Sequence, residues 1–170
     1  MERTDPEVVA GELTMLSQYL DYQRATLLAK ASGLDDAGWR AKVGNSELTL
    51  AGLVKHMALV EDSWFQKTMA GEPVREPWAS APWDEDRDWE FHTAPDDDPA
   101  EVLDLYREAC ERSRATVARL GDPEALAASL TRRGNRPSLR WVMLHMLEET
   151  ARHNGHADLI RERVDGTTGE

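Results

Sequence analysis

The chain has 170 residues, and its 32 acidic against 20 basic residues give a formal charge of −12 at pH 7. This charge repels nucleic acid and anionic membranes, so we exclude both as partners and expect a single domain, residues 1–170, around one core. The single cysteine excludes an internal disulfide framework. Because the N-terminus is charged and no long apolar run occurs, we expect a cytoplasmic protein.

Apolar residues recur at helical spacing in four long segments, and no segment alternates for long enough to form a strand, so we predict an all-α fold. The first helix is predicted to begin near Thr4 or Asp5, with Pro6 in its first turn, and to end at Ser32–Gly33. A short helical turn is expected around residues 34–39. The other three helices each have an N-capping residue before them and a glycine after them: Thr49 to Gly71, Asp98 to Gly121, and Ser138 to Gly166.

Four helices that each carry one apolar stripe most simply form a four-helix bundle. A long crossover joins the second and third helices and shows neither helical nor strand periodicity. It contains Trp78, Trp83 and Trp89. Connections of this length are often functional loops or lids. The alternative, which we weigh equally, is that the tryptophans simply pin the crossover onto the outside of the bundle.

Polar side chains interrupt the apolar stripe of the fourth helix, in the segment HMLEETARHNGHADLIRE at residues 145–162. Residues four apart share a helix face, so His145, Glu149 and His153 form one row, and the stripe passes through the last two. Glu148 lies beside the stripe and has Arg152 four residues on, which predicts a solvent-facing ion pair. Glu149 and His153 are therefore expected to point inward.

The second helix repeats this anomaly, because His56 lies in its apolar stripe between Leu53 and Val60. A divalent cation would compensate a buried Glu149 and satisfy both imidazoles, and helix bundles commonly build metal sites in this way. His56, Glu149 and His153 would form a His₂Glu ligand set, which suits catalytic zinc or ferrous iron and leaves coordination positions open. The alternative is a hydrogen-bonded polar core without a metal.

The segments LTLAGLVKHMALVEDSWF and SLRWVMLHMLEETARHNGHADLIRE resemble the DinB-like superfamily of metal-binding four-helix bundles. In that superfamily one metal histidine lies in the middle of helix two, and a pair of histidines spaced by four lies on helix four. These positions fall on His56, Glu149 and His153, with glutamate in place of the first histidine of the pair. His156 stands where the superfamily usually has glutamine. The glutamate variant is similar to the mycothiol-dependent branch, which includes maleylpyruvate isomerase and mycothiol S-transferase.

The resemblance implies a metal-dependent thiol transferase, in which zinc, or else nickel or iron, binds the sulfur of mycothiol for attack on an electrophilic small molecule. It leaves His145 and His156 as candidate catalytic residues that orient a ligand, hold Glu149 or move a proton. The alternatives are an isomerase or hydrolase that uses metal-bound water, and a non-catalytic, stress-associated metal-binding protein that forms a homodimer. Cys110 is not expected to react. Three further cations are interpreted as exposed charges: Arg24, Lys55 and Arg152.

Overall fold

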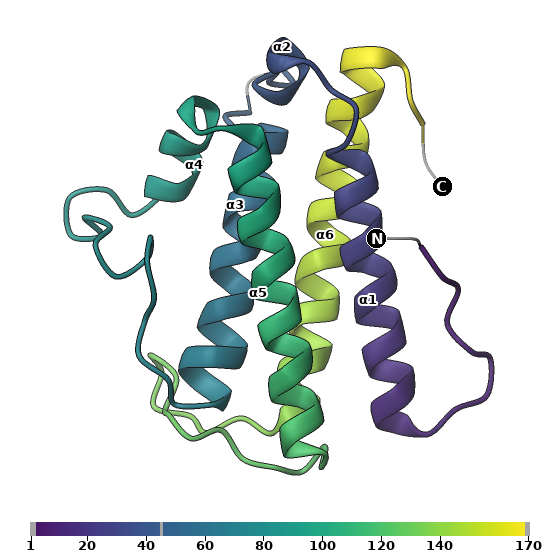
Figure 1. Ribbon diagram of the computed structural model, residues 1–170, viewed down its shortest axis with the longest axis vertical. Helices are drawn as coiled ribbons and strands as arrows, with labels where there is room; N and C mark the ends of the chain where they lie inside the picture. Colours follow the sequence, from purple (N-terminus) through teal and green to yellow (C-terminus); the bar gives the residue numbers. More distant parts are fainter. Residues whose placement is uncertain (1–2, 45, 169–170) are drawn as a thin grey trace.

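The computed structural model describes residues 3–44 and 46–168, and within them the regular structure is helical, without a strand. Two short helices, α2 (Asp36–Trp39) and α4 (Trp89–Thr93), and a 3₁₀ turn, η2 (Ala94–Asp96), lie in the connections. The predicted all-α four-helix bundle is confirmed (Figure 1). Its long elements are α1 (Glu12–Lys30), α3 (Leu50–Glu61) with its continuation η1 (Asp62–Met69), α5 (Pro99–Leu120) and α6 (Leu139–Asp165).

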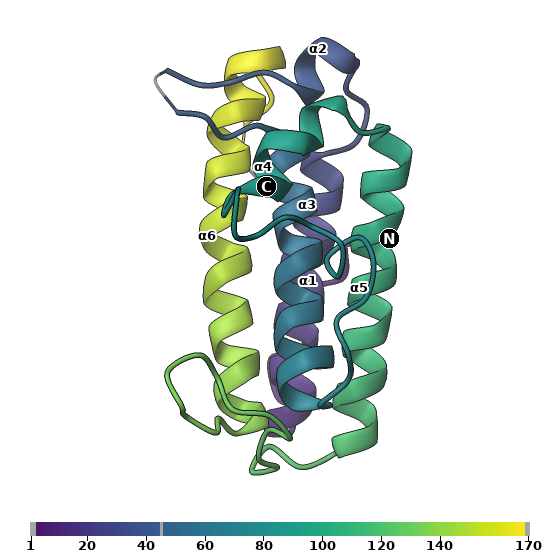
Figure 2. The ribbon, with the colours of Figure 1, turned by 90° about the vertical axis from the view of Figure 1, so that its left-hand side faces the viewer.

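The bundle is assembled from two closely packed pairs, α1 against α6 and α3 against α5. The crossover of residues 70–98 leaves one end of α3–η1 and returns along the outside of the bundle to the other end (Figures 1 and 2). It is long enough to span the bundle, so α3 and α5 run parallel instead of forming a hairpin. In Figure 2, α3 and α6 lie side by side, and these two helices carry the predicted metal ligands.

The predicted boundaries of the last three long helices are confirmed, and each follows from local chemistry. A side-chain oxygen before each helix satisfies an N–H group of the first turn that has no partner within the helix. Gly121 ends α5 and Gly166 ends α6. Their φ angles, +63° and +74°, lie in the left-handed region. The capping pairs are Thr49 Oγ1 with the N–H of Gly52, Asp98 Oδ1 with that of Ala100, and Ser138 Oγ with that of Trp141.

The predicted start of the first helix near Asp5 is wrong, because α1 begins only at Glu12. Val8 and Val9 are almost fully exposed, so the preceding segment has no apolar face to bury, and Gly11 disfavours extension of the helix backwards. Instead, the segment folds back beside α1. The backbone N–H of Glu7 donates to Gln18 Oε1, and Gln18 Nε2 donates to Glu7 Oε1. Proline in the sequence signalled a helix start that tertiary packing does not support.

The tryptophans of the crossover pin it to the bundle. Trp78 is buried, and Trp83 and Trp89 pack partly buried against the core. The indole rings of Trp78 and Trp83 each contact that of Trp89 edge to face, with centroids 6.4 and 5.9 Å apart. The tryptophans therefore anchor the crossover to the bundle. The anchored crossover also carries α4 onto α3, beside the predicted metal ligands.

The core is formed where the four apolar stripes meet, and it includes the fully buried Leu27, Leu53, Met57, Val142 and Met146. Burying each of these side chains contributes about 1.5–3 kcal/mol to folding. This packing holds α3 and α6 in fixed positions. Within the described residues, no helix is both long enough and apolar enough to cross a membrane.

Candidate metal centre

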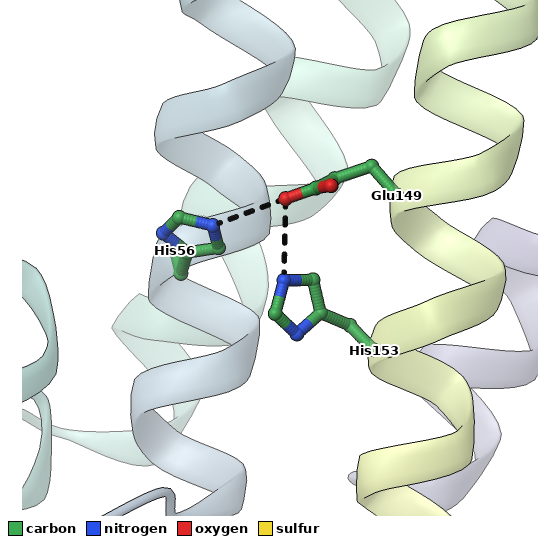
Figure 3. Close-up of side chains that lie close together, drawn as sticks. All are labelled: His56, Glu149 and His153. Atoms are coloured by element: carbon green, nitrogen blue, oxygen red, sulfur yellow. Dashed lines mark ion pairs between the residues drawn. The ribbon is translucent and has the colours of Figure 1, made fainter.

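His56 on α3 and Glu149 and His153 on α6 point toward one another across the space between the two helices (Figure 3). One oxygen, Glu149 Oε1, lies 3.7 Å from His56 Nε2 and 3.4 Å from His153 Nε2. One potential ligand atom from each residue lies within 4.8 Å of the other two. The prediction that these side chains turn inward and meet is thus confirmed by the geometry.

Two of the distances between these donor atoms are close to those around a small divalent cation. Two ligands about 2.1 Å from a tetrahedral zinc ion are separated by roughly 3.4 Å, close to the two nitrogen-to-oxygen distances. The same distances are too long for ordinary hydrogen bonds between the imidazoles and the carboxylate. The donor set of two imidazole nitrogens and one carboxylate suits zinc, nickel or iron(II) and leaves coordination positions for a substrate.

His153 is held in the neutral form that a metal ligand requires. Burial lowers the pKa of His153 to about 4, and the neighbouring His56 imidazole acts in the same direction, although the Glu149 carboxylate opposes both. Its Nδ1 lies 3.3 Å from Nδ1 of His156. If the His153 ring donates through Nδ1, its Nε2 lone pair faces Glu149. His156 thus contacts a predicted metal ligand and not Glu149 itself.

His56 is oriented by a residue that the sequence did not reveal, Glu90 on α4. The Nδ1–H group of His56 donates to Glu90 Oε1 over 2.9 Å. Glu90 is only 4 % exposed, so this hydrogen bond is protected from water. Because a carboxylate accepts and does not donate, the bond fixes the ring tautomer and leaves Nε2 free to face Glu149 and His153.

Phe91, the next residue on α4, packs against a face of the His56 ring. The two rings are stacked, with centroids 4.8 Å apart and planes inclined by 25°. Gly52 makes this approach possible, because a Cβ atom there would lie only 2.8 Å from a ring carbon of Phe91. Glu90 and Phe91 together restrict both the position and the rotation of the imidazole.

Lys55, beside His56 on α3, fastens the crossover at the same place. Its Nζ donates to Thr93 Oγ1 over 2.6 Å and to Asp97 Oδ2 over 2.5 Å, and it lies 4.2 Å from the centre of the Trp89 ring. Lys55 is buried, and so is Arg24, so the interpretation of both as exposed charges is wrong. Each is compensated by carboxylates that are distant in the sequence, and this compensation permits burial.

Glu90→Ala is expected to weaken zinc binding by about tenfold to a hundredfold, because substitution of a carboxylate that supports a metal-binding histidine typically has an effect of this size. Glu90→Gln should lose less affinity, since its amide oxygen can still accept a hydrogen bond from His56 Nδ1–H. Zinc titration against a competing chelator measures both. Glu85→Ala is the matched control, because Glu85 lies exposed on the same crossover. Unchanged affinity in Glu90→Ala would show that Glu90 does not position His56.

Two other residues of α6 singled out by the sequence, His145 and Glu148, lie outside the three converging side chains. The His145 ring packs against Trp64 and Trp141, with centroids 4.7 and 5.1 Å away. Glu148 pairs with Arg152 on the exposed face of α6, as the sequence predicted. Glu148 and Glu149 are therefore adjacent in the sequence but have different surroundings.

A protein-family model matches most of the chain. The family model described as mycothiol S-transferase matches residues 15–166, which include all four long helices apart from the first turn of α1. The chain belongs to this family. Its three converging side chains all lie within the matched region. A search of curated proteins found no match to the chain.

Proposed function

We propose that the protein is a divalent-metal-dependent S-transferase that uses mycothiol to attack an electrophilic small molecule. The observation that carries the proposal is the convergence of His56, Glu149 and His153 in a chain of the mycothiol S-transferase family. Zinc is the metal we favour, with nickel or iron as alternatives. A cytoplasmic location would suit the reaction, since that compartment keeps small thiols reduced. Homodimer formation stays a prediction.

The three side chains would hold the metal through two neutral nitrogens and one carboxylate oxygen. A divalent ion bound there would supply a Lewis acid that favours the thiolate form of a thiol, which is the reactive nucleophile. Glu90 and Phe91 keep the His56 ring in place, and His156 lies against Nδ1 of His153. This contact suits His156 to orienting His153. His145 and His156 both stay candidates for moving the thiol proton.

The sulfur comes from the cosubstrate in this proposal, because the chain's own thiol is poorly suited to attack. Cys110 is fully buried, and burial raises the pKa of its thiol well above the ordinary value, with the neighbouring Glu61 carboxylate adding to the shift. A neutral, enclosed thiol is a weak nucleophile. Cys110→Ser is therefore expected to keep the transferase activity.

The test is conjugation of mycothiol to 1-chloro-2,4-dinitrobenzene by the zinc-loaded protein. The carbon–sulfur bond forms, the carbon–chlorine bond breaks, chloride leaves with its electron pair and the thiol proton passes to solvent. Glu149→Ala is expected to slow the reaction at least about a hundredfold, since a catalytic metal contributes several kcal/mol of transition-state stabilisation. Glu148→Ala should retain the rate. The change in absorbance as 1-chloro-2,4-dinitrobenzene is conjugated measures the rates of both variants.

Three results would overturn the proposal. The first is a rate no faster than that of free mycothiol with the dye. The second is an equal rate of dye hydrolysis without any thiol, which would favour a hydrolase that uses metal-bound water. The third is a zinc-loaded protein that is inert toward every thiol and electrophile tested, which would favour a metal-binding protein without catalytic function.

A further inference from the structure

Three aromatic rings gather beside the metal centre, and the proposed roles of the metal ligands leave them unexplained. The rings of Trp64 on η1 and of Trp141 and His145 on α6 form what we call the aromatic cluster. Trp141 stacks on His145 with planes 17° apart, and Trp64 meets both rings at steeper angles. The centroids lie between 4.7 and 5.4 Å apart, so each ring contacts the other two.

The cluster bridges the same two helical elements that hold the metal centre. His145 precedes Glu149 by four residues in α6, which places it about one turn, roughly 6 Å, further along the helix. Trp64 follows His56 by eight residues in the continuous helix formed by α3 and η1. Its contact with His145 shows that it has returned to the face directed at α6. A small molecule at the His145 end of the cluster would therefore lie about one helical turn from the centre, whereas Trp141, eight residues before Glu149, lies about two turns, roughly 12 Å, along the helix.

The cluster is open to solvent at one end. Trp141 is 49 % exposed, as is Leu144. Scattered exposed apolar side chains are normal in proteins. Here, however, the exposed indole of Trp141 contacts the partly buried rings of Trp64 and His145. His145 forms no hydrogen bond among the described residues, and its Nδ1 lies 4.0 Å from the nearest Glu148 oxygen. The packing of its ring is thus aromatic, and the cluster offers mainly π-surface to a ligand.

We propose that the aromatic cluster binds the electrophilic substrate and that this substrate is a planar, electron-poor aromatic compound. The inference rests on the proposed function, because the electrophile is defined by the thiolate that attacks it. Indole faces carry negative electrostatic potential, so they attract a ring from which nitro or similar groups have withdrawn electrons. Aliphatic electrophiles of similar size lack this attraction. The cluster therefore favours aryl over alkyl electrophiles.

The first test measures binding without metal, thiol or reaction. 1,3-Dinitrobenzene has no leaving group, so its affinity for the intact protein can be measured by calorimetry, with the tryptophan side-chain N–H signals followed by NMR. We expect shifts at Trp64 and Trp141, an affinity about tenfold lower in Trp141→Ala, and recovery in Trp141→Phe. Nitrocyclohexane should bind much more weakly. Tyr19→Ala, which removes a similarly exposed aromatic residue from α1, is the control.

The second test is kinetic and separates this inference from the proposed function. With mycothiol and zinc, Trp141→Ala should raise the KM for 1-chloro-2,4-dinitrobenzene about tenfold with little change in kcat, and leave the KM for iodoacetamide unchanged. If Trp141→Ala binds dinitrobenzene as tightly as the unaltered protein, the inference is wrong even when conjugation occurs. If dinitrobenzene binding depends on Trp141 but no thiol is conjugated, the proposed function fails and an aromatic binding site remains.

Discussion

Glu149→Ala should abolish the stabilisation that zinc gives to the protein. A ligand that binds only the folded state at one hundred times its dissociation constant stabilises it by about 2.7 kcal/mol. In a domain of this length, that corresponds to a rise in Tm of about 5–10 °C. Among the three candidate ligands Glu149 supplies the carboxylate, so in Glu149→Ala thermal unfolding with and without zinc should give the same Tm.

Glu148→Ala is the matched control for this measurement. The two glutamates are neighbours in α6, but Glu148 is exposed and pairs with Arg152, whereas Glu149 faces both histidines. The same substitution one residue away should preserve the zinc-dependent rise in Tm. His56→Ala, on the other helix, should lose it. Retention of the rise in both Glu149→Ala and His56→Ala, or its absence in the unaltered protein, would refute the metal centre.

The sequence predicted the elements whose signals are local. The capping residues Thr49, Asp98 and Ser138 act on helix turns that immediately follow them, so their effect is visible in a few letters. The predicted start of α1 was wrong, because the true start depends on which side chains before Gly11 can be buried. That burial is a tertiary property. The segment η1, which continues α3 from Asp62, has π-helical hydrogen bonds, and no local sequence pattern predicts this change.

The metal centre could be predicted because its histidine and glutamate residues occupy positions in the helical repeat that are otherwise apolar. Histidine and glutamate in an apolar stripe require an explanation, and two such helices suggest one interior site. Glu90 was missed because it lies in an aperiodic crossover, 34 residues from His56, where nothing in the sequence links the two. Its only visible hint is a carboxylate between Trp89 and Phe91, two aromatic residues that favour burial.

Glu61→Ala should destabilise the protein by about 3–5 kcal/mol, because it leaves a buried guanidinium without its main partner. Arg24 donates from Nε and one terminal nitrogen to the two oxygens of Glu61, over 2.7 and 2.6 Å, and the two residues are 2 % and 0 % exposed. Burial alone would lower the pKa of Arg24, but the Glu61 carboxylate outweighs it and raises that pKa well above the ordinary value. The arginine therefore stays charged in the core. Urea unfolding at low temperature measures the loss.

The double variant Arg24→Met/Glu61→Leu distinguishes a missing partner from a missing side chain. It removes both charges and fills the space with apolar atoms, and such replacements of buried ion pairs are often neutral or stabilising. We therefore expect it to recover most of the stability that Glu61→Ala loses. Asp21 would keep its ion pair with Arg114 in the double variant, so no buried charge is stranded. If the double variant is as unstable as Glu61→Ala, the ion pair itself contributes favourably to folding and the desolvation argument is wrong. If Glu61→Ala loses less than about 1 kcal/mol, Asp21 compensates Arg24 without help from Glu61.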